Sequence, residues 1–299
     1  MKFFDKNITI TSNYYDQHIS NKKNWFGNIP PFSNLEINIT DLCNRKCFFC
    51  PKSNRKIFPN RNEFLTDELF ERIMNQLASL SFKGRISFCG LSEPFMHKNL
   101  VSLVLIAKKL CPQSYLDILT NGDFLTIVNV KALFKSGLDN IKISMYDGPH
   151  QIESFNSIKE KCSLSDEQFV IRKRYLSSGN SFGMTINNRG GSVKLKEYGI
   201  IPLKEPLQRS CYYPFHKLII DYNGDVMICP CDWEKKYVIG NLRKESILDI
   251  WTSEAITKVR LRLIKKDRSN PPCQKCDIKG TLYAKLHFQA WKYYYGMDI

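Results

Sequence analysis

Residues 41–50 have the sequence Asp-Leu-Cys-Asn-Arg-Lys-Cys-Phe-Phe-Cys, which brings Cys43, Cys47 and Cys50 into one short stretch. Three thiolates this close can ligate three corners of a four-iron cluster, whereas closed electron-transfer clusters use four cysteines. The fourth iron is then free to bind a ligand and pass it an electron. A zinc site is the alternative, but zinc prefers four ligands and Cys-x2-Cys pairs. No fourth ligand stands close by in the sequence.

The number of cysteines also points to metal binding. The chain has 299 residues and 11 cysteines, and eight of these fall in the groups 43/47/50, 211/229/231 and 273/276. A secreted disulfide scaffold would be shorter and would carry a signal peptide. Residues 1–20 are polar, and the sequence has no 18-residue apolar stretch. We therefore expect a soluble, cytoplasmic protein that does not associate with membranes.

The charge of the chain suggests an anionic partner. The formal net charge is +15, and two four-iron clusters on seven thiolates would lower it to roughly +12. Such an excess favours a phosphorylated small molecule, an acidic peptide or a nucleic acid, unless it is only a solvated basic surface. The lysines are scattered rather than gathered in one tract, so a nucleic acid is the least favoured of these partners.

Strands and helices are predicted to alternate through the first two thirds of the chain. Strands are expected at 34–40, 85–89, 115–119, 140–144, 169–175 and 183–187, and helices at 66–80, 99–110 and 128–135. This alternation predicts a parallel sheet, whose chemistry lies at the carboxyl ends of its strands. The cysteine loop and the loops after the next three strands should therefore meet. Residues 1–34 are expected to be irregular.

The pattern changes near residue 205. Residues 216–222 and 225–228 flank Asn223-Gly224, which is a strong signal for a β-hairpin. A helix is expected at 245–265 and another at 282–295. We predict three segments, namely an N-terminal extension at 1–34, a strand-and-helix domain at 35–204 and a hairpin-and-helix domain at 205–299.

With these residues in view, the chain resembles the radical S-adenosylmethionine (SAM) enzymes, and within them the SPASM/twitch subgroup, over residues 34–280. The resemblance implies an α/β fold, a partial (β/α)6 TIM-like barrel followed by a twitch/SPASM-like domain. It also implies that Cys43, Cys47 and Cys50 hold a 4Fe–4S cluster whose open iron chelates SAM. Reductive cleavage of SAM then gives a 5′-deoxyadenosyl radical, which removes a hydrogen atom from the substrate.

Further motifs of that family follow the predicted strands. Residues 90–94, Gly-Leu-Ser-Glu-Pro, resemble its Gly-Glu-Pro motif, although Ser92 stands where glycine is usual. The resemblance assigns Glu93 to the SAM ammonium group, a charge-assisted contact.

Three other residues complete the implied SAM site. Asn121, within Thr-Asn-Gly, matches a strand end near SAM, and Ser144 matches a serine near the ribose. Either Arg172 or Arg174 lies where related enzymes bring an arginine to the SAM carboxylate, and we favour Arg172.

The second cysteine set resembles a twitch domain with a single auxiliary 4Fe–4S cluster. Five cysteines compete for four places, and we predict that Cys211, Cys229, Cys273 and Cys276 are the ligands. Cys231 would then be free, because two ligands one residue apart would strain the chain on one cube. Structural zinc is the alternative for this set.

Several functions remain open on the sequence alone. The first is oxidation of a carbohydrate or cyclitol hydroxyl, with the auxiliary cluster taking the second electron. The second is epimerisation of a sugar or peptide carbon, with Cys231 returning hydrogen. The third is modification of a ribosomal peptide, and an iron–sulfur sensor or nucleic-acid binder is the non-catalytic alternative.

Arg189 is a candidate for contacting a substrate anion or for taking a hydroxyl proton. Flavodoxin or ferredoxin is the expected reductant.

Overall fold

The centre of the molecule is an eight-stranded sheet. The computed structural model describes residues 6–177, 180–181 and 186–297. The strands of the sheet are β1 (Asn34–Ile37), β2 (Arg85–Phe88), β3 (Tyr115–Thr120), β4 (Asn140–Met145), β5 (Phe169–Lys173), β8 (Lys217–Ile220), β9 (Asp225–Met227) and β10 (Val238–Asn241). Their order is β10-β9-β8-β1-β2-β3-β4-β5. The pairs from β8 to β5 are parallel, and β9 and β10 extend the sheet antiparallel.

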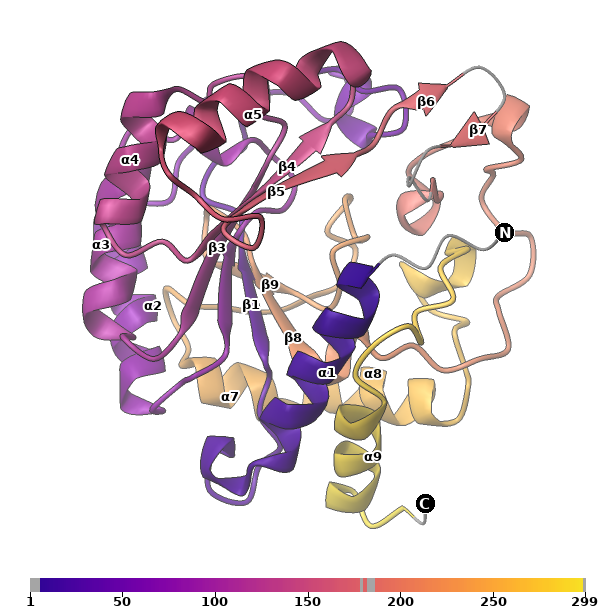
Figure 1. Ribbon diagram of the computed structural model, residues 1–299. Helices are drawn as coiled ribbons and strands as arrows, with labels where there is room; N and C mark the ends of the chain where they lie inside the picture. Colours follow the sequence, from indigo (N-terminus) through magenta and orange to yellow (C-terminus); the bar gives the residue numbers. More distant parts are fainter. Residues whose placement is uncertain (1–5, 178–179, 182–185, 298–299) are drawn as a thin grey trace.

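Four helices cover the outer face of the parallel strands, as Figure 1 shows on its left side and across its top. They are α2 (Asp67–Ser79), α3 (Leu100–Leu110), α4 (Ile127–Lys135) and α5 (Ile152–Lys161). The Thr66 side chain accepts a hydrogen bond from the Leu69 backbone and so begins α2 where the sequence predicts. Apolar side chains of β1 such as Leu35 and Ile37 are fully buried, while Glu36 between them points to the inner face. The barrel interior is therefore polar.

The α/β partial barrel is confirmed, but its sixth parallel strand comes from an unexpected place. Residues 183–185 of the predicted sixth strand lie outside the described residues, and Ile186 and Asn187 belong to no strand. The sixth parallel strand is β8 of the predicted hairpin, which pairs with β1 so that Asn34 stands opposite Lys217. β6 (Leu176–Ser177) and β7 (Asn180–Ser181) form a separate two-stranded sheet. The division into segments 1–34, 35–204 and 205–299 stays a prediction.

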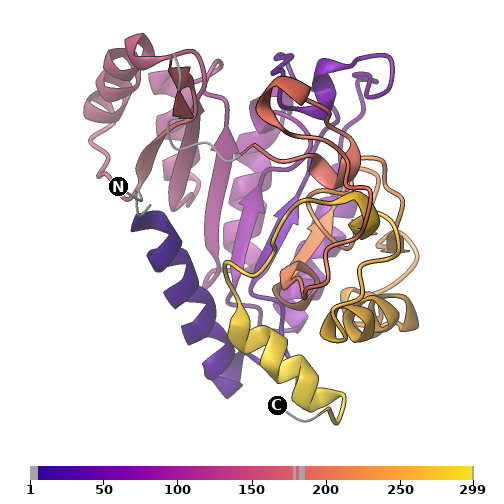
Figure 2. The same cartoon turned by 90° about the vertical axis from the view of Figure 1, so that its right-hand side faces the viewer.

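The expectation that residues 1–34 are irregular is wrong. Helix α1 (Lys6–Ser20) lies beside α9 (Lys285–Tyr294) at the amino ends of the strands (Figures 1 and 2). Tyr15 of α1 is buried and its ring contacts His216 and His287 at centroid distances of 4.9 and 6.3 Å. Residues 7–11, Asn-Ile-Thr-Ile-Thr, have low helix propensity. Tertiary packing therefore stabilises this helix, and the local sequence gives no sign of it.

The predicted helix at 245–265 is two helices, α7 (Ile247–Thr252) and α8 (Glu254–Ile264). Ser253 has extended backbone angles and its side chain accepts a hydrogen bond from the Ile256 backbone, so it ends one helix and begins the next. The short helix α6 (Tyr213–His216) precedes β8. Short 3-10 helices are η1 (Lys22–Asn24), η2 (Pro51–Ser53), η3 (Pro94–Met96), η4 (Pro149–Gln151), η5 (Arg189–Gly191), η6 (Lys196–Tyr198) and η7 (Cys273–Lys275). Within the described ranges, the helices are too short or too polar to cross a membrane.

Candidate active site

Glu93 connects the loops that follow the first three strands. Its Oε1 accepts hydrogen bonds from the Thr120 hydroxyl at 2.6 Å and the Phe95 backbone at 3.2 Å, and its Oε2 accepts one from the Asn121 backbone at 2.8 Å. Its own backbone N–H donates to the carbonyl of Leu42, next to the first cysteine. The predicted meeting of these loops at one end of the sheet is therefore observed.

The Glu93 carboxylate keeps acceptor capacity for a cation. The side chain is 2% exposed, and burial raises the pKa of its carboxyl group although three donors oppose the rise. A carboxylate has about four lone-pair sites, and the hydrogen bonds described above use three of them. The remaining site on Oε2 suits an ammonium group, which would also offset the cost of burying the negative charge.

Two cationic side chains hold the backbone of the cysteine loop in place through hydrogen bonds. The Arg55 guanidinium donates to the backbone carbonyls of Cys43 and Arg45 at 2.6 and 2.7 Å. The Lys52 ammonium is buried, donates to the carbonyls of Asp41 and Pro59, and has its pKa lowered by burial. These contacts fix the shape of the loop, and they set positive charge beside the thiols.

Arg45 fastens the cysteine loop to two neighbouring loops. Its guanidinium forms ion pairs with Asp123, after β3, and with Asp147, after β4. The Asn44 side chain adds a bond to Asp123 and accepts one from the Asn121 side chain at 2.8 Å. An arginine fork can hold two carboxylates at once, which a lysine cannot match. No motif in the sequence predicts these two ion pairs, because both carboxylates are far from Arg45 along the chain.

The three thiols of the first set lie near one another. Burial raises the pKa of the Cys47 thiol to about 12, and the nearby charges of Cys50 and Cys43 add to the rise. Burial also raises the pKa values of Cys43 and Cys50. Bound iron would displace the protons, because a metal cation stabilises the thiolate. The chemistry of this donor set fits a three-cysteine cluster.

Ser144 and Arg172 lie side by side on the inner face. They stand opposite each other in the register of β4 and β5. Ser144 is buried and hydrogen-bonded to Tyr146. Arg172 is partly exposed; burial lowers the pKa of Lys142, and the positive charge of Arg172 adds to that lowering. Both predicted SAM contacts are thus on neighbouring strands of the same edge as Glu93.

All five cysteines of the second set line one small cavity. Its walls include Cys211, Cys229, Cys231, Cys273 and Cys276. Burial raises the pKa values of Cys273 and Cys276 to about 12, and the charges of neighbouring thiols contribute to both shifts. In the part of the chain that the structure describes, no three His, Cys, Asp or Glu side chains converge tightly enough for a single metal ion. A cluster spreads its irons over a cube, so its ligands stand farther apart.

Arg268 holds the segments of the second set together. This buried guanidinium donates to four backbone carbonyls, those of residues 209, 210, 278 and 279, at 2.6–2.9 Å. Burial raises the pKa of the Cys211 thiol, and the Arg268 charge opposes the rise. Arg268 therefore brings a distant part of the chain to Cys211 and offsets the negative charge expected on a ligated cluster.

Arg189 precedes Gly190, which lines the cavity of the second cysteine set, and the Arg189 charge acts on thiols of both sets. Burial raises the pKa of Cys50 and the Arg189 guanidinium opposes this rise. The pKa of Cys231 is lowered first by its hydrogen bond with Cys229, and Arg189 adds to the lowering. Arg189 has a φ of 47°, which is uncommon for a residue other than glycine. Its loop is fixed because the Asn188 amide donates to the carbonyls of Ile201 and Lys275.

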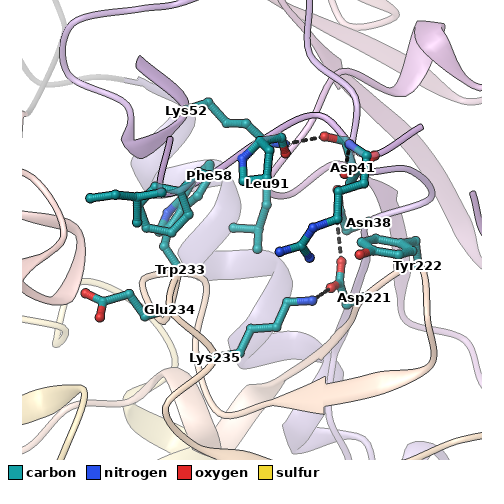
Figure 3. Close-up of a pocket in the computed structure, with 13 residues that line it drawn as sticks. Asn38, Asp41, Lys52, Phe58, Leu91, Asp221, Tyr222, Trp233, Glu234 and Lys235 are labelled. Atoms are coloured by element: carbon teal, nitrogen blue, oxygen red, sulfur yellow. Dashed lines mark hydrogen bonds and ion pairs between the residues drawn. The ribbon is translucent and has the colours of Figure 1, made fainter. Parts of the chain in front are cut away.

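A cavity of about 310 Å³ opens at the carboxyl ends of β1 and β8 (Figure 3). On its floor, the Asn38 amide donates to Asp221 at 2.5 Å, and Asp221 forms an ion pair with Lys235. Its walls include the aromatic rings of Phe58, Tyr222 and Trp233. Polar residues alternate at positions 34, 36 and 38 of the predicted strand, and this pattern could have placed Asn38 on the inner face. No sequence pattern points to Asp221 or Lys235 as residues of the site.

Comparison with known proteins agrees with this geometry. Residues 37–162 match the model of the Radical SAM superfamily, and residues 211–277 match SPASM, an iron–sulfur cluster-binding domain. The chain is 30% identical over 249 residues to the S-adenosyl-L-methionine-dependent 2-deoxy-scyllo-inosamine dehydrogenase of Niallia circulans, covering 82% of this chain and 93% of that protein. It is 25% identical over 321 residues to the tungsten-containing aldehyde ferredoxin oxidoreductase cofactor-modifying protein of Pyrococcus furiosus, covering 83% and 88%.

A solved structure gives the same result. The crystal structure of BtrN in complex with AdoMet and 2-DOIA matches with a TM-score of 0.68 and 29% identity, over 83% of this chain and 93% of that chain. The cofactors are accordingly a 4Fe–4S cluster with SAM and an auxiliary iron–sulfur cluster, while their individual ligands stay predictions. The chain belongs to the radical SAM superfamily, as an enzyme with a SPASM-type domain after its partial barrel.

Proposed function

We propose that this enzyme oxidises a secondary hydroxyl group of a carbohydrate or cyclitol to a ketone. The observation that carries the proposal is the position of Arg189, since the adjacent Gly190 lines the cavity of the five cysteines and the Arg189 charge also acts on Cys50 of the first set. A substrate held by Arg189 would lie between the radical source and the auxiliary cluster. The similarity to an enzyme named as a 2-deoxy-scyllo-inosamine dehydrogenase supports a cyclitol or a related small molecule.

The chemistry requires a hydrogen atom, a proton and an electron to leave the alcohol. When bound, SAM and the first cluster supply the 5′-deoxyadenosyl radical that takes the hydrogen atom. The auxiliary cluster, for which Cys211, Cys229, Cys273 and Cys276 are our proposed ligands, would supply an electron acceptor. The planar guanidinium of Arg189 presents hydrogen-bond donors and no acceptor. It would therefore donate hydrogen bonds to the hydroxyl oxygen and stabilise the negative charge that develops there as the hydroxyl proton passes to water.

Four residues are proposed to position SAM. The free acceptor site of Glu93 would take the ammonium group, and Arg172 would pair with the carboxylate. Asn121 and Ser144 would lie along the nucleoside, since both follow or end strands at the same edge of the sheet. These assignments rest on the network around Glu93 and on the register of β4 and β5.

The first cluster needs one electron from outside for each SAM cleaved. We propose that a flavodoxin or ferredoxin supplies it. The 11 cysteines are free thiols in the structure, which suits the reducing cytoplasm, where we propose that the enzyme works.

Label transfer tests the proposed reaction. The anaerobically reconstituted enzyme is incubated with SAM, dithionite and cyclitols or aminocyclitols deuterated at each carbinol carbon. We expect deuterium in 5′-deoxyadenosine and one ketone for each SAM consumed. An Arg189→Gln variant should still bind SAM but form less than a tenth of the ketone, and Arg189→Lys should recover part of it. Unlabelled 5′-deoxyadenosine without any ketone from every candidate would contradict the proposal.

Epimerisation is a second candidate because five cysteines line this cavity, whereas a four-iron cluster is ligated by only four of them. If Cys231 is the thiol left over, it could return a hydrogen atom to the opposite face of a substrate radical. Turnover in heavy water separates the two functions, since epimerisation places one solvent deuterium in the product. Cys231→Ala would then stop product formation while hydrogen abstraction continues.

A further inference from the structure

The cysteine loop and the residues after it form a strongly basic surface segment. Residues 42–62 contain six lysines and arginines and no aspartate or glutamate. Three of the six have internal partners, because Arg45 pairs with two aspartates and Lys52 and Arg55 donate to backbone carbonyls. The others are Lys46, Lys56 and Arg61, which are exposed and form no ion pair within the described residues.

These three cations lie around one edge of the cysteine loop. Arg55 donates to the carbonyls of Cys43 and Arg45, which brings the stretches 43–46 and 55–56 side by side. Arg61 returns to the base of the loop, where its backbone N–H donates to the Asp41 carboxylate at 2.6 Å. Ile57 and Arg61 also line the cavity at the carboxyl ends of β1 and β8. We call Lys46, Lys56, Ile57 and Arg61 the basic rim.

The rim also has an apolar centre. The Ile57 side chain is 62% exposed, although it follows directly on a cation and precedes Phe58, whose ring packs edge-on against Trp233. Ile57 could serve as the apolar contact of a small interface whose edge is polar and charged. Electron-transfer encounters belong to the small end of interface sizes.

We propose that the basic rim is the docking surface for an acidic one-electron carrier protein, which delivers the electron for SAM cleavage. This inference rests on the proposed function. The carrier is oxidised by one electron and the cluster held by Cys43, Cys47 and Cys50 is reduced by one electron. Charge complementarity identifies the partner, since the exposed cations Lys46, Lys56 and Arg61 outnumber the one exposed acid next to them in the chain, Glu63, and so attract an acidic protein and repel a basic one.

The position of the rim suits this role. The basic residues belong to the same continuous stretch of chain as the three thiols, so a docked carrier would lie over the cysteine loop. Arg45 and Arg55 use their guanidinium groups to hold the loop in place, which leaves Lys46 and Lys56 free to contact a partner. A small reductant needs no such surface. The choice of reductant therefore separates docking from chemistry.

The test compares two reductants on the reconstituted holoenzyme. The variant Lys56→Glu reverses one charge of the rim at a residue that does not line the cavity. The control, Lys109→Glu, makes the same change of net charge at an exposed position on the outer helix α3. The formation of 5′-deoxyadenosine is measured with dithionite and with a reduced acidic flavodoxin, and flavodoxin binding is measured separately by fluorescence anisotropy at low and moderate salt.

We expect both variants to work like the wild type with dithionite. With flavodoxin, the rim variant should show a KM and a Kd at least about threefold higher and a weaker dependence on salt, while the control stays close to the wild type. Equal KM and Kd values for rim variant and wild type would overturn the inference, as would an equal loss with both reductants. Failure of the wild type to cleave SAM with dithionite would instead contradict the proposed function.

Discussion

The Ser92 hydroxyl donates a hydrogen bond to the side-chain oxygen of Asn38 at 2.5 Å. Asn38 in turn donates to Asp221, so the loop proposed to bind SAM is connected through β1 to the end of β8. This bond accounts for a serine at a position where related enzymes usually have glycine. The serine contributes a hydrogen bond that a glycine could not make.

Removal of that hydroxyl should loosen the loop. For Ser92→Ala, we expect the Kd for SAM to rise about threefold to tenfold, because a net hydrogen bond contributes about 0.5–1.5 kcal/mol. Iron content should not change, and Ser92→Thr should restore affinity by keeping the hydroxyl. Anaerobic equilibrium dialysis measures the Kd. Wild-type affinity in Ser92→Ala would show that the bond to Asn38 does not position the loop.

Loss of charge at Glu93 should have a larger effect. Glu93→Gln keeps the size of the side chain but removes the negative charge proposed to face the SAM ammonium group. We expect SAM affinity to fall by about tenfold to a hundredfold, since hydrogen bonds to charged groups contribute about 1.5–3 kcal/mol. Thr120→Val removes only a neutral donor to Glu93 and should change the Kd less. If the two variants bound SAM equally, the ammonium would not be the partner of Glu93.

Two glycines form a matched pair for testing the auxiliary cluster. Gly280 and Gly199 have φ values of 71° and 69°, but only at Gly280 would a Cβ overlap a thiol, that of Cys211. We expect Gly280→Ala to lower iron after reconstitution from about eight to about four per chain, while Gly199→Ala keeps about eight. Both variants carry the same backbone strain, so the difference isolates Cys211. Eight irons in both would exclude Cys211 as a ligand.

The buried histidines below the barrel should make stability depend on pH. Burial lowers the pKa of His216 to about 3 and that of His18 to about 4. The unfolded chain binds these protons near pH 6.5, whereas the folded protein does not. The free energy of unfolding is therefore highest above pH 6.5. It falls below that pH by up to about 1.4 kcal/mol per pH unit for each histidine.

His216→Gln isolates one of these contributions. Denaturant unfolding between pH 7.5 and 5 should give a shallower loss of stability for this variant than for the wild type, and parallel behaviour above pH 7. A slope equal to that of the wild type would mean that His216 is protonated in the folded protein.

The sequence predicted the strands and helices that have strong local signals. Thr66 caps α2 as expected, and the Asn223-Gly224 hairpin forms. The alternation of the chain was enough for the fold class. It did not show that β8 joins β1, because residues 34 and 217 pair across a distance that local patterns do not cover. α1 was missed since its stability comes from contacts of Tyr15 with residues near the C-terminus.

The site shows the same contrast between residues marked by local sequence motifs and residues whose role depends on long-range contacts. Glu93 and Asn121 were found through short motifs, and the structure brings them into one network. Arg45 and Arg268 had no motif, although they fix the two cysteine sets, because their partners are carboxylates and carbonyls from distant loops. Residues that contact a cofactor leave a local pattern, whereas those that support them depend on how the chain folds.

The most direct test of the account is the formation of 5′-deoxyadenosine by the Cys47→Ala variant. Cys47 is the middle thiol of the first set, and its removal leaves two ligands for a cluster that needs three. After anaerobic reconstitution with dithionite and SAM, the wild type should form 5′-deoxyadenosine and Cys47→Ala should form none, while the auxiliary cluster retains about four irons. Formation of 5′-deoxyadenosine by Cys47→Ala at the wild-type rate would contradict the assignment of this loop as the source of the radical.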